Sequence, residues 1–338
     1  MPQSSKKPFA KFKKWQKDFL SRRPHRSFKL TRRRDYERDL TLPGYIAFTH
    51  FVNKTLWSYR KLLFGLAAIY LVLFGILVGI GSQETYNTLV DSLNETNESL
   101  ASGDISQLGN ASVLFISIAT VGLTSTPTEA QQVYAVILGL LVWLTTIWLL
   151  RNKLAGHAIK LRDGLYNAGA PIISTFLVIL VLLIQLIPIL IAAVGYSAAS
   201  ATGMLAGGVE AMLFWFAASL LGLLSIFWST STLFGMVIVT LPGKYPMQAL
   251  RSAGDIVLGR RVRILLRWVW MFLMLIIAWA IVLIPVILLE MWLKSIWPVV
   301  GDIPIVPVVQ AILGTLSIIW VSGYVYLLYR KVVDERSN

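Results

Sequence analysis

The sequence contains no cysteine and few charged residues. The absence of cysteine excludes disulfide bonds, thiolate metal sites and cysteine nucleophiles. Only 14% of the 338 residues are charged, whereas 56% are hydrophobic and the mean hydropathy is +0.67. A soluble domain needs more charge than this to cover its surface. The composition therefore predicts an integral membrane protein.

Charged side chains are completely missing from six long apolar runs. The runs cover residues 62–80, 130–150, 172–194, 211–240, 268–289 and 308–329. A helix needs about 20 apolar residues to cross the hydrocarbon core, where its backbone groups must pair with one another. The runs are continuously apolar, whereas barrel strands alternate. We therefore predict an all-α fold with six transmembrane helices, forming a membrane domain over residues 44–338.

Motifs of known chemistry are absent as well. The sequence has no HExxH, GxSxG or P-loop motif, and its three histidines have no neighbouring ligands at metal spacing. Pumps and proton-coupled carriers usually place an ionisable residue within a span, and the six runs contain none. We predict no enzymatic activity, no cofactor and no metal site.

Six crossings divide the polar segments between two faces of the membrane, and basic residues are nearly absent from one face. All Lys and Arg residues except Lys294 fall in residues 1–61, 151–171, 242–267 and 330–338. The acidic residues divide almost evenly between the two sides, so only the basic ones discriminate. The positive-inside rule therefore predicts a protein of the cytoplasmic membrane with both termini in the cytoplasm. It also supports the count of six spans.

Four arginines stand at the predicted cytoplasmic entrance of the fifth span. Long basic side chains can reach headgroups while their stems cover apolar surface. We predict that these arginines contact anionic lipid headgroups. They are Arg260, Arg261, Arg263 and Arg267.

Three amphipathic stretches precede pairs of spans, at residues 45–59, 154–168 and 246–258. Their apolar residues recur at helical spacing, as in Leu250, Ala253 and Val257. They are too polar to span and suit the membrane interface. The chain can thus be interpreted as three repeated units of interfacial helix plus hairpin, with an axis along the membrane normal. The alternative is that any three hairpins look alike at this level.

The stretch QALRSAGDIVLGRRVRIL, which begins at Gln248, carries a resemblance to a known family. It resembles the helix before a hairpin in the membrane domain of bacterial glycerophosphodiester phosphodiesterases and related small multi-pass proteins, over residues 246–290. The whole chain is similar to membrane proteins of ultra-small candidate-phylum bacteria, which have no activity attached. The resemblance implies a bacterial inner-membrane module without the catalytic phosphodiesterase domain.

The first 43 residues are polar, strongly basic and poor in aliphatic side chains, which predicts a disordered cytoplasmic tail. Basic residues interleaved with aromatic ones suit an anionic membrane surface, and RNA binding through phosphates is the less favoured alternative. We predict anionic phospholipid as the partner of this tail and regard nucleic acid as improbable. The predicted lipid contacts are Lys11, Lys13, Lys14 and Lys17.

Residues 81–129 form the one sizeable predicted extracytoplasmic loop. The loop has no basic residue, and its apolar stretch 113–124 is too short to cross and reads as re-entrant or interfacial. Because residues 1–40 contain no apolar run, we expect residues 62–80 to act as an uncleaved signal anchor.

Polar residues within the runs are few. We interpret Gln185 as a helix–helix hydrogen bond rather than a substrate ligand, and the hydroxyls of the fourth run as packing contacts. Those hydroxyls belong to Ser225, Ser229, Thr230, Ser231 and Thr232. Glu290 and Lys294 stand at the outer end of the fifth run, as an interfacial anchor or as an outer-vestibule pair.

The sequence indicates function only in outline. We expect a non-enzymatic membrane scaffold or envelope-homeostasis component that contacts anionic lipid and a membrane protein partner or a second copy. The alternative is a passive transporter, channel or lipid translocator. A pore should show polar faces along several spans, and only the fourth run approaches this.

Overall fold

The computed structural model describes residues 42–79, 128–202, 204–205, 207–297 and 305–334. Within this described part the regular structure is entirely helical, with nine helices and no strand. Six of the helices are long and apolar enough to cross a membrane. The predicted all-α fold with six spans is confirmed, and the chain is by helix composition a multi-pass membrane protein. The predicted basic tail and outer loop lie almost wholly outside the described residues.

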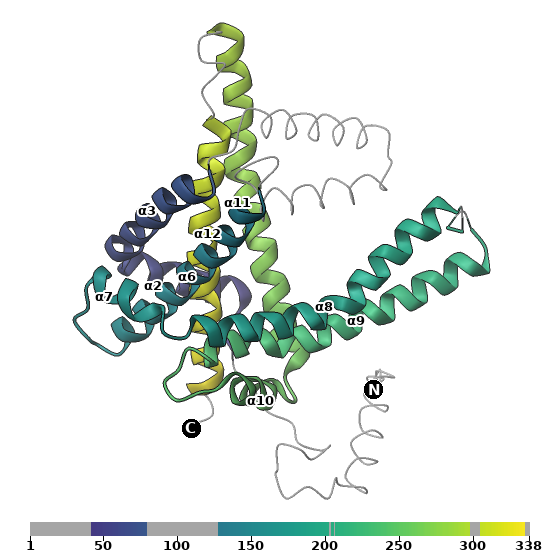
Figure 1. Ribbon diagram of the computed structural model, residues 1–338, viewed down its shortest axis with the longest axis horizontal. Helices are drawn as coiled ribbons and strands as arrows, with labels where there is room; N and C mark the ends of the chain where they lie inside the picture. The colour runs from purple at the N-terminus through teal and green to yellow at the C-terminus, as the bar shows by residue number, and fades with distance from the viewer. Residues whose placement is uncertain (1–41, 80–127, 203, 206, 298–304, 335–338) are drawn as a thin grey trace, which may run out of the picture.

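The helices follow the predicted order of one short helix and two long ones, three times over (Figure 1). The short helices are α2 (Tyr45–Ser58), α7 (Leu161–Ala168) and α10 (Pro246–Val257). The long helices are α3 (Arg60–Leu77), α6 (Glu129–Leu154), α8 (Ile172–Ala201), α9 (Val209–Ile238), α11 (Arg261–Ile296) and α12 (Ile305–Asp334).

Local chemistry explains several helix ends. Thr128 and Gln131 form a reciprocal capping box at the start of α6. Gly156, with φ of 85°, ends that helix in a left-handed turn. The amphipathic stretch 154–168 is therefore shorter as a helix than predicted, because α6 ends at Leu154 and α7 begins only at Leu161. Gly259, with φ of 76°, makes the equivalent sharp turn between α10 and α11.

The short helices pack in a cyclic order. α7 packs on α6 and α10 packs on α9, so each lies against the long helix that precedes it in the chain. α2 has no described predecessor, and it packs on α12, the last long helix. There the Phe48 and Tyr324 rings meet edge to face with centroids 5.0 Å apart, and the Trp320 indole donates to Asn53 across 2.8 Å. The first unit thus contacts the third through α2 and α12.

A glycine makes each of these three contacts close. A Cβ added at Gly323 of α12 would lie 2.8 Å from the Leu56 side chain of α2. One added at Gly235 of α9 would lie 3.2 Å from Leu250 of α10. In the third contact the glycine is on the short helix, where a Cβ on Gly164 would lie 2.8 Å from Leu149. Small residues let helix backbones approach in membranes, which is how the short helices are held.

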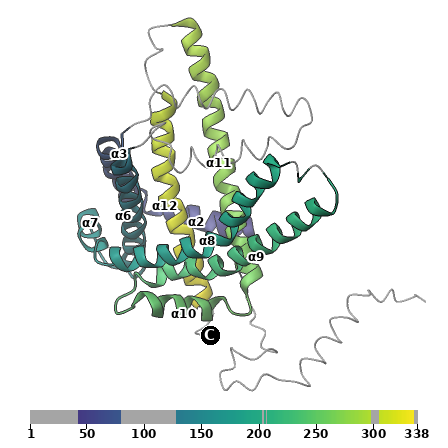
Figure 2. The same cartoon turned by 45° about the vertical axis from the view of Figure 1, so that its right-hand side comes forward.

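The helices divide into three regions that differ in burial. We call α2, α3, α6, α7, α11 and α12 the body. We call the parts of α8 and α9 between residues 180 and 228 the arm, and the rest of both helices, with α10, the root. Figures 1 and 2 show α8 and α9 leaving the body together, crosswise to α11 and α12.

The root is packed into the body, whereas the arm is not. Phe234 in the root is fully buried, with ring centroids 5.2 Å from Trp268 and 6.3 Å from Tyr329. In the arm the described buried residues are only Ala199, Ala211 and Ser225. The main buried cluster therefore lies where the body and the root meet, two smaller clusters lie within the body, and the arm carries apolar side chains on its outside.

Candidate functional site

The four predicted headgroup arginines lie around the start of α11, and two of them are engaged in helix packing. Arg267 is buried, and its guanidinium donates to the carbonyls of Pro43 and Gly44, the second across 3.4 Å. The same group lies over the Tyr45 ring at 4.3 Å. Arg267 therefore holds the start of α2 against α11.

Arg261 joins α11 to the arm. Its Nη1 donates to the Phe227 carbonyl across 2.5 Å, and its guanidinium carbon lies 3.8 Å from the centroid of the Phe227 ring. Arg260 is buried and Arg263 is exposed. Headgroup contact stays a prediction for all four arginines. The four lysines of the tail, Lys11, Lys13, Lys14 and Lys17, lie outside the described residues.

The polar residues of α8 and α9 lie in or beside the arm and bond to one another or to their own helices. The Thr232 hydroxyl donates to Gln185 across 2.6 Å, which joins the two helices. Ser225 accepts the Ile189 N–H across 3.2 Å. The ring of Pro188, the residue before Ile189, crowds the preceding helical turn, and the Ser225 hydroxyl of the neighbouring helix offers the Ile189 N–H an acceptor there.

The other three hydroxyls of this group bond to carbonyls one turn back in α9. Ser229 and Thr230 donate to Ile226, and Ser231 donates to Trp228. The hydroxyls are satisfied within the helix pair, so they do not need water or a ligand as a partner.

Glu290 near the C-terminal end of α11 is fully buried although it is a carboxylate. One oxygen lies 2.6 Å from the Lys294 ammonium and the other accepts the Val306 N–H at the start of α12 across 2.8 Å. A carboxylate at a helix N-terminus is stabilised by the free N–H groups and by the helix dipole. The pair thus holds the C-terminal part of α11 against the start of α12.

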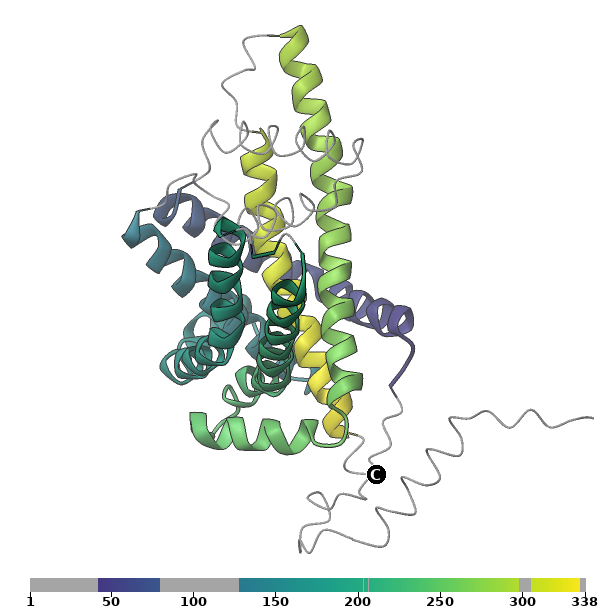
Figure 3. The same cartoon turned by 90° about the vertical axis from the view of Figure 1, so that its right-hand side faces the viewer.

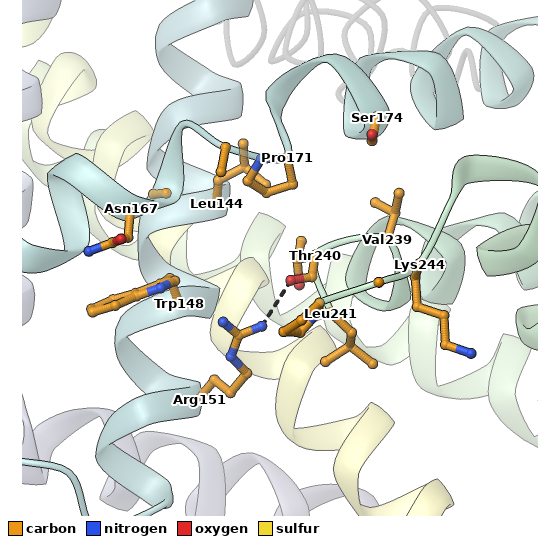
Figure 4. Close-up of a pocket in the computed structure, with 14 residues that line it drawn as sticks. Leu144, Trp148, Arg151, Asn167, Pro171, Ser174, Val239, Thr240, Leu241 and Lys244 are labelled. Carbon is orange, nitrogen blue, oxygen red and sulfur yellow. Dashed lines mark hydrogen bonds between the residues drawn. The ribbon is translucent and has the colours of Figure 1, made fainter.

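A pocket opens where the body meets the root. It lies between the end of α6, the turn from α7 to α8 and the turn after α9, and its volume is about 350 Å³ (Figure 4). Its apolar wall includes Leu144, Trp148 and Leu241, and its polar groups come from the residues that follow. They are Arg151, Asn167, Ser174, Thr240 and Lys244.

The pocket is cationic. Arg151 and Lys244 line it, and no carboxylate is among its lining residues. The Nη1 of Arg151 donates to the Thr240 carbonyl across 2.8 Å, which orients the guanidinium, as Figure 4 shows. Such a site favours an anion with an apolar part.

Sequence reasoning did not single out this pocket. Arg151 and Lys244 counted only toward the orientation of the chain, and 92 residues separate them from one another in sequence. Gln310, a buried amide in α12, was also overlooked, although the residue type and the apolar run around it are visible in the sequence.

Among the described residues no cluster of three His, Cys, Asp or Glu side chains could hold a metal ion. Comparison of the chain with protein-family models, with curated proteins and with solved structures gives no match in any of the three. The resemblance drawn on residues 246–290 therefore stays a prediction.

Proposed function

We propose that the chain is a non-enzymatic membrane scaffold that presents the arm to a partner protein within the bilayer. In this proposal it lies in a bacterial cytoplasmic membrane with both termini inside, and it belongs to envelope homeostasis rather than to metabolism. The observation that carries the proposal is the arm itself.

The arm is a pair of packed helices with an exposed apolar surface. α8 and α9 pack extensively on each other and are joined by the Gln185–Thr232 hydrogen bond. Outward-facing side chains are largely exposed, at 59% for Leu190, 62% for Leu213 and 64% for Leu223. Helix association in lipid depends on close packing rather than on apolarity, so a partner would have to fit the side chains of this surface closely. A helix pair that stands away from its own body leaves room for such a contact with a second membrane protein.

The charged side chains near the described spans support a structural role. Arg267 holds α2, Arg261 holds α9, and Glu290 with Lys294 holds the start of α12. Each of these groups is occupied by a contact between helices. Catalysis or coupled transport instead needs ionisable groups that face a substrate.

The proposed orientation agrees with where the cations gather. The start of α11, the end of α12 and α10 meet at one end of the molecule, the lower end in Figure 3. These segments carry Arg251, Arg260, Arg263 and Arg330, as the positive-inside rule requires of a cytoplasmic end.

A passive transporter, channel or lipid translocator is the second candidate. The observation in its favour is the kinked, polar junction at Pro188, Gln185 and Ser225. We rank it below the scaffold because these polar groups bond to one another between α8 and α9.

The test is photo-cross-linking in native membranes with a benzophenone amino acid at Leu190 or Leu213 of the arm. The matched control is Leu273, an exposed leucine on α11. We expect one discrete protein adduct from the arm positions and none from the control. A mass of twice the chain would identify a second copy as the partner. Lipid adducts alone, together with solute or lipid flux through vesicles containing the pure protein, would replace the scaffold with the transporter.

A further inference from the structure

We propose that the pocket between the body and the root binds the phosphate headgroup of an anionic phospholipid, with Arg151 and Lys244 as its cationic contacts. This inference does not depend on the scaffold role, because it rests on a different surface. It assigns a ligand to a pocket whose lining residues include two cations and no carboxylate.

The charge of the pocket is the first argument. Both ionisable lining residues are cations, and Arg151 donates a hydrogen bond to a neutral carbonyl, that of Thr240. A guanidinium has five N–H donors in a planar fork that matches phosphate oxygens. The bond to Thr240 uses one donor and fixes the plane, and the remaining donors can meet a phosphate.

Neighbouring polar groups complete a site for a headgroup. The Ser174 hydroxyl in the first turn of α8 lines the pocket and has no hydrogen-bond partner within the described part of the chain. Asn167 donates its amide N–H to the Asp163 carbonyl, which holds this side chain at the rim. Lys244 follows Gly243, whose φ of 73° makes the tight turn that places the lysine beside the pocket. Figure 4 shows the Lys244 side chain directed away from Arg151, so this exposed side chain would turn inward to meet a phosphate that Arg151 and Ser174 hold.

The apolar wall and the position favour a lipid over a soluble phosphate ester. Leu144 and Trp148 lie in the second half of α6, Leu241 lies in the turn after α9, and all three line the pocket. The volume of about 350 Å³ lies in the range of small-molecule sites, and basic pockets between spans on the cytoplasmic side are typical headgroup sites. The glycerol and the upper acyl chains would lie along the apolar wall.

The experiment measures phosphatidylglycerol binding to the intact protein by native mass spectrometry from nanodiscs. The nanodiscs contain phosphatidylcholine with or without phosphatidylglycerol. The test variant carries R151Q and K244Q together. The matched control carries K160Q and R162Q, which remove the same two charge types from exposed positions at the same side of the membrane.

We expect the R151Q/K244Q variant to bind phosphatidylglycerol about 30-fold more weakly, since each cation near the surface contributes about 1 kcal/mol. The control should bind like the natural sequence. Equal binding by all three proteins would overturn the proposal. If the double variant does not fold, K244Q alone removes one charge at an exposed position and should weaken binding about fivefold.

Two further measurements sharpen the test. The first distinguishes binding in the pocket from binding to surface charge, and the second distinguishes a lipid from a soluble phosphate. S174F keeps both charges but fills the pocket, so it should abolish the selective binding, and unchanged binding would overturn the proposal. Inorganic phosphate and glycerol phosphate are added to nanodiscs of pure phosphatidylcholine. Saturable binding of either one, with no preference for phosphatidylglycerol, would overturn the lipid assignment in favour of a soluble phosphate. Arm cross-links report on the scaffold proposal separately.

Discussion

The body and the arm both consist of apolar helices, but protein buries those of the body much more than those of the arm. Within the most apolar 18-residue window of each helix, 56% of α6 is buried by protein, against 6% of α8 and 6% of α9. Lipid tails are as apolar as leucine, so an apolar helix gains little by exchanging lipid for protein. The comparison teaches that burial here depends on close packing and polar bonds rather than on hydropathy.

The largest expected effect comes from phenylalanines at opposite ends of α9. Phe234→Ala in the root should lower the free energy of unfolding by about 4 kcal/mol, because it empties a fully buried site beside Trp268 and Tyr329. Phe216→Ala in the arm, where the ring is 66% exposed, should change it by less than about 0.5 kcal/mol. Thermal or denaturant unfolding in one detergent compares the two. Equal losses would show that the arm is packed as the body is.

The next effect concerns two glutamates near helix ends, Glu290 in α11 and Glu210 in α9. Glu290→Ala should destabilise the protein by about 3 kcal/mol, since it leaves Lys294 without its buried partner and Val306 without its acceptor. Glu210→Ala at the exposed start of α9 serves as the control and should be nearly neutral. The same unfolding measurement applies. A neutral Glu290→Ala would mean that α11 and α12 are held together without the ion pair.

Two glycines should respond to alanine with opposite signs. At Gly164 a Cβ would lie 2.8 Å from Leu149 and 3.3 Å from Thr145, so Gly164→Ala should cost about 1–2 kcal/mol. At Gly222 in the arm nothing lies within 4 Å, so Gly222→Ala should stabilise the helix by up to about 1 kcal/mol. The difference in midpoint between the two variants measures the contrast, and effects of the same sign would contradict it.

The smallest effect tests the polar bond where the arm joins the root. Thr232→Val keeps the side-chain shape and removes the donor to Gln185, which should cost about 0.6 kcal/mol. A double-mutant cycle with Gln185→Leu isolates the bond, with Ser219→Ala as a control whose hydroxyl bonds within its own helix. A coupling energy of zero would mean that packing alone joins α8 to α9.

Much of the helical framework could be predicted from sequence because the signals are local. Continuous apolar runs indicate spans. The helix end at Gly156 was not predicted, because the expected amphipathic stretch 154–168 runs through it. The pocket could not be predicted either, since Arg151 and Lys244 line one site only through the tertiary packing of their helices. Nor did the interfacial position of Glu290 reveal that it is fully buried against the start of α12.

The sequence by itself determined the membrane class, the six spans and the short amphipathic helices, because transfer from water to lipid is a property of each segment. The tertiary structure alone decided which helices form the body and which form the arm. The most apolar windows of α9 and α12 have the same mean hydropathy, 2.0, yet 6% of one and 39% of the other are buried. Hydropathy compares water with an apolar phase and cannot distinguish lipid from protein, whereas the fit of side chains between helices can.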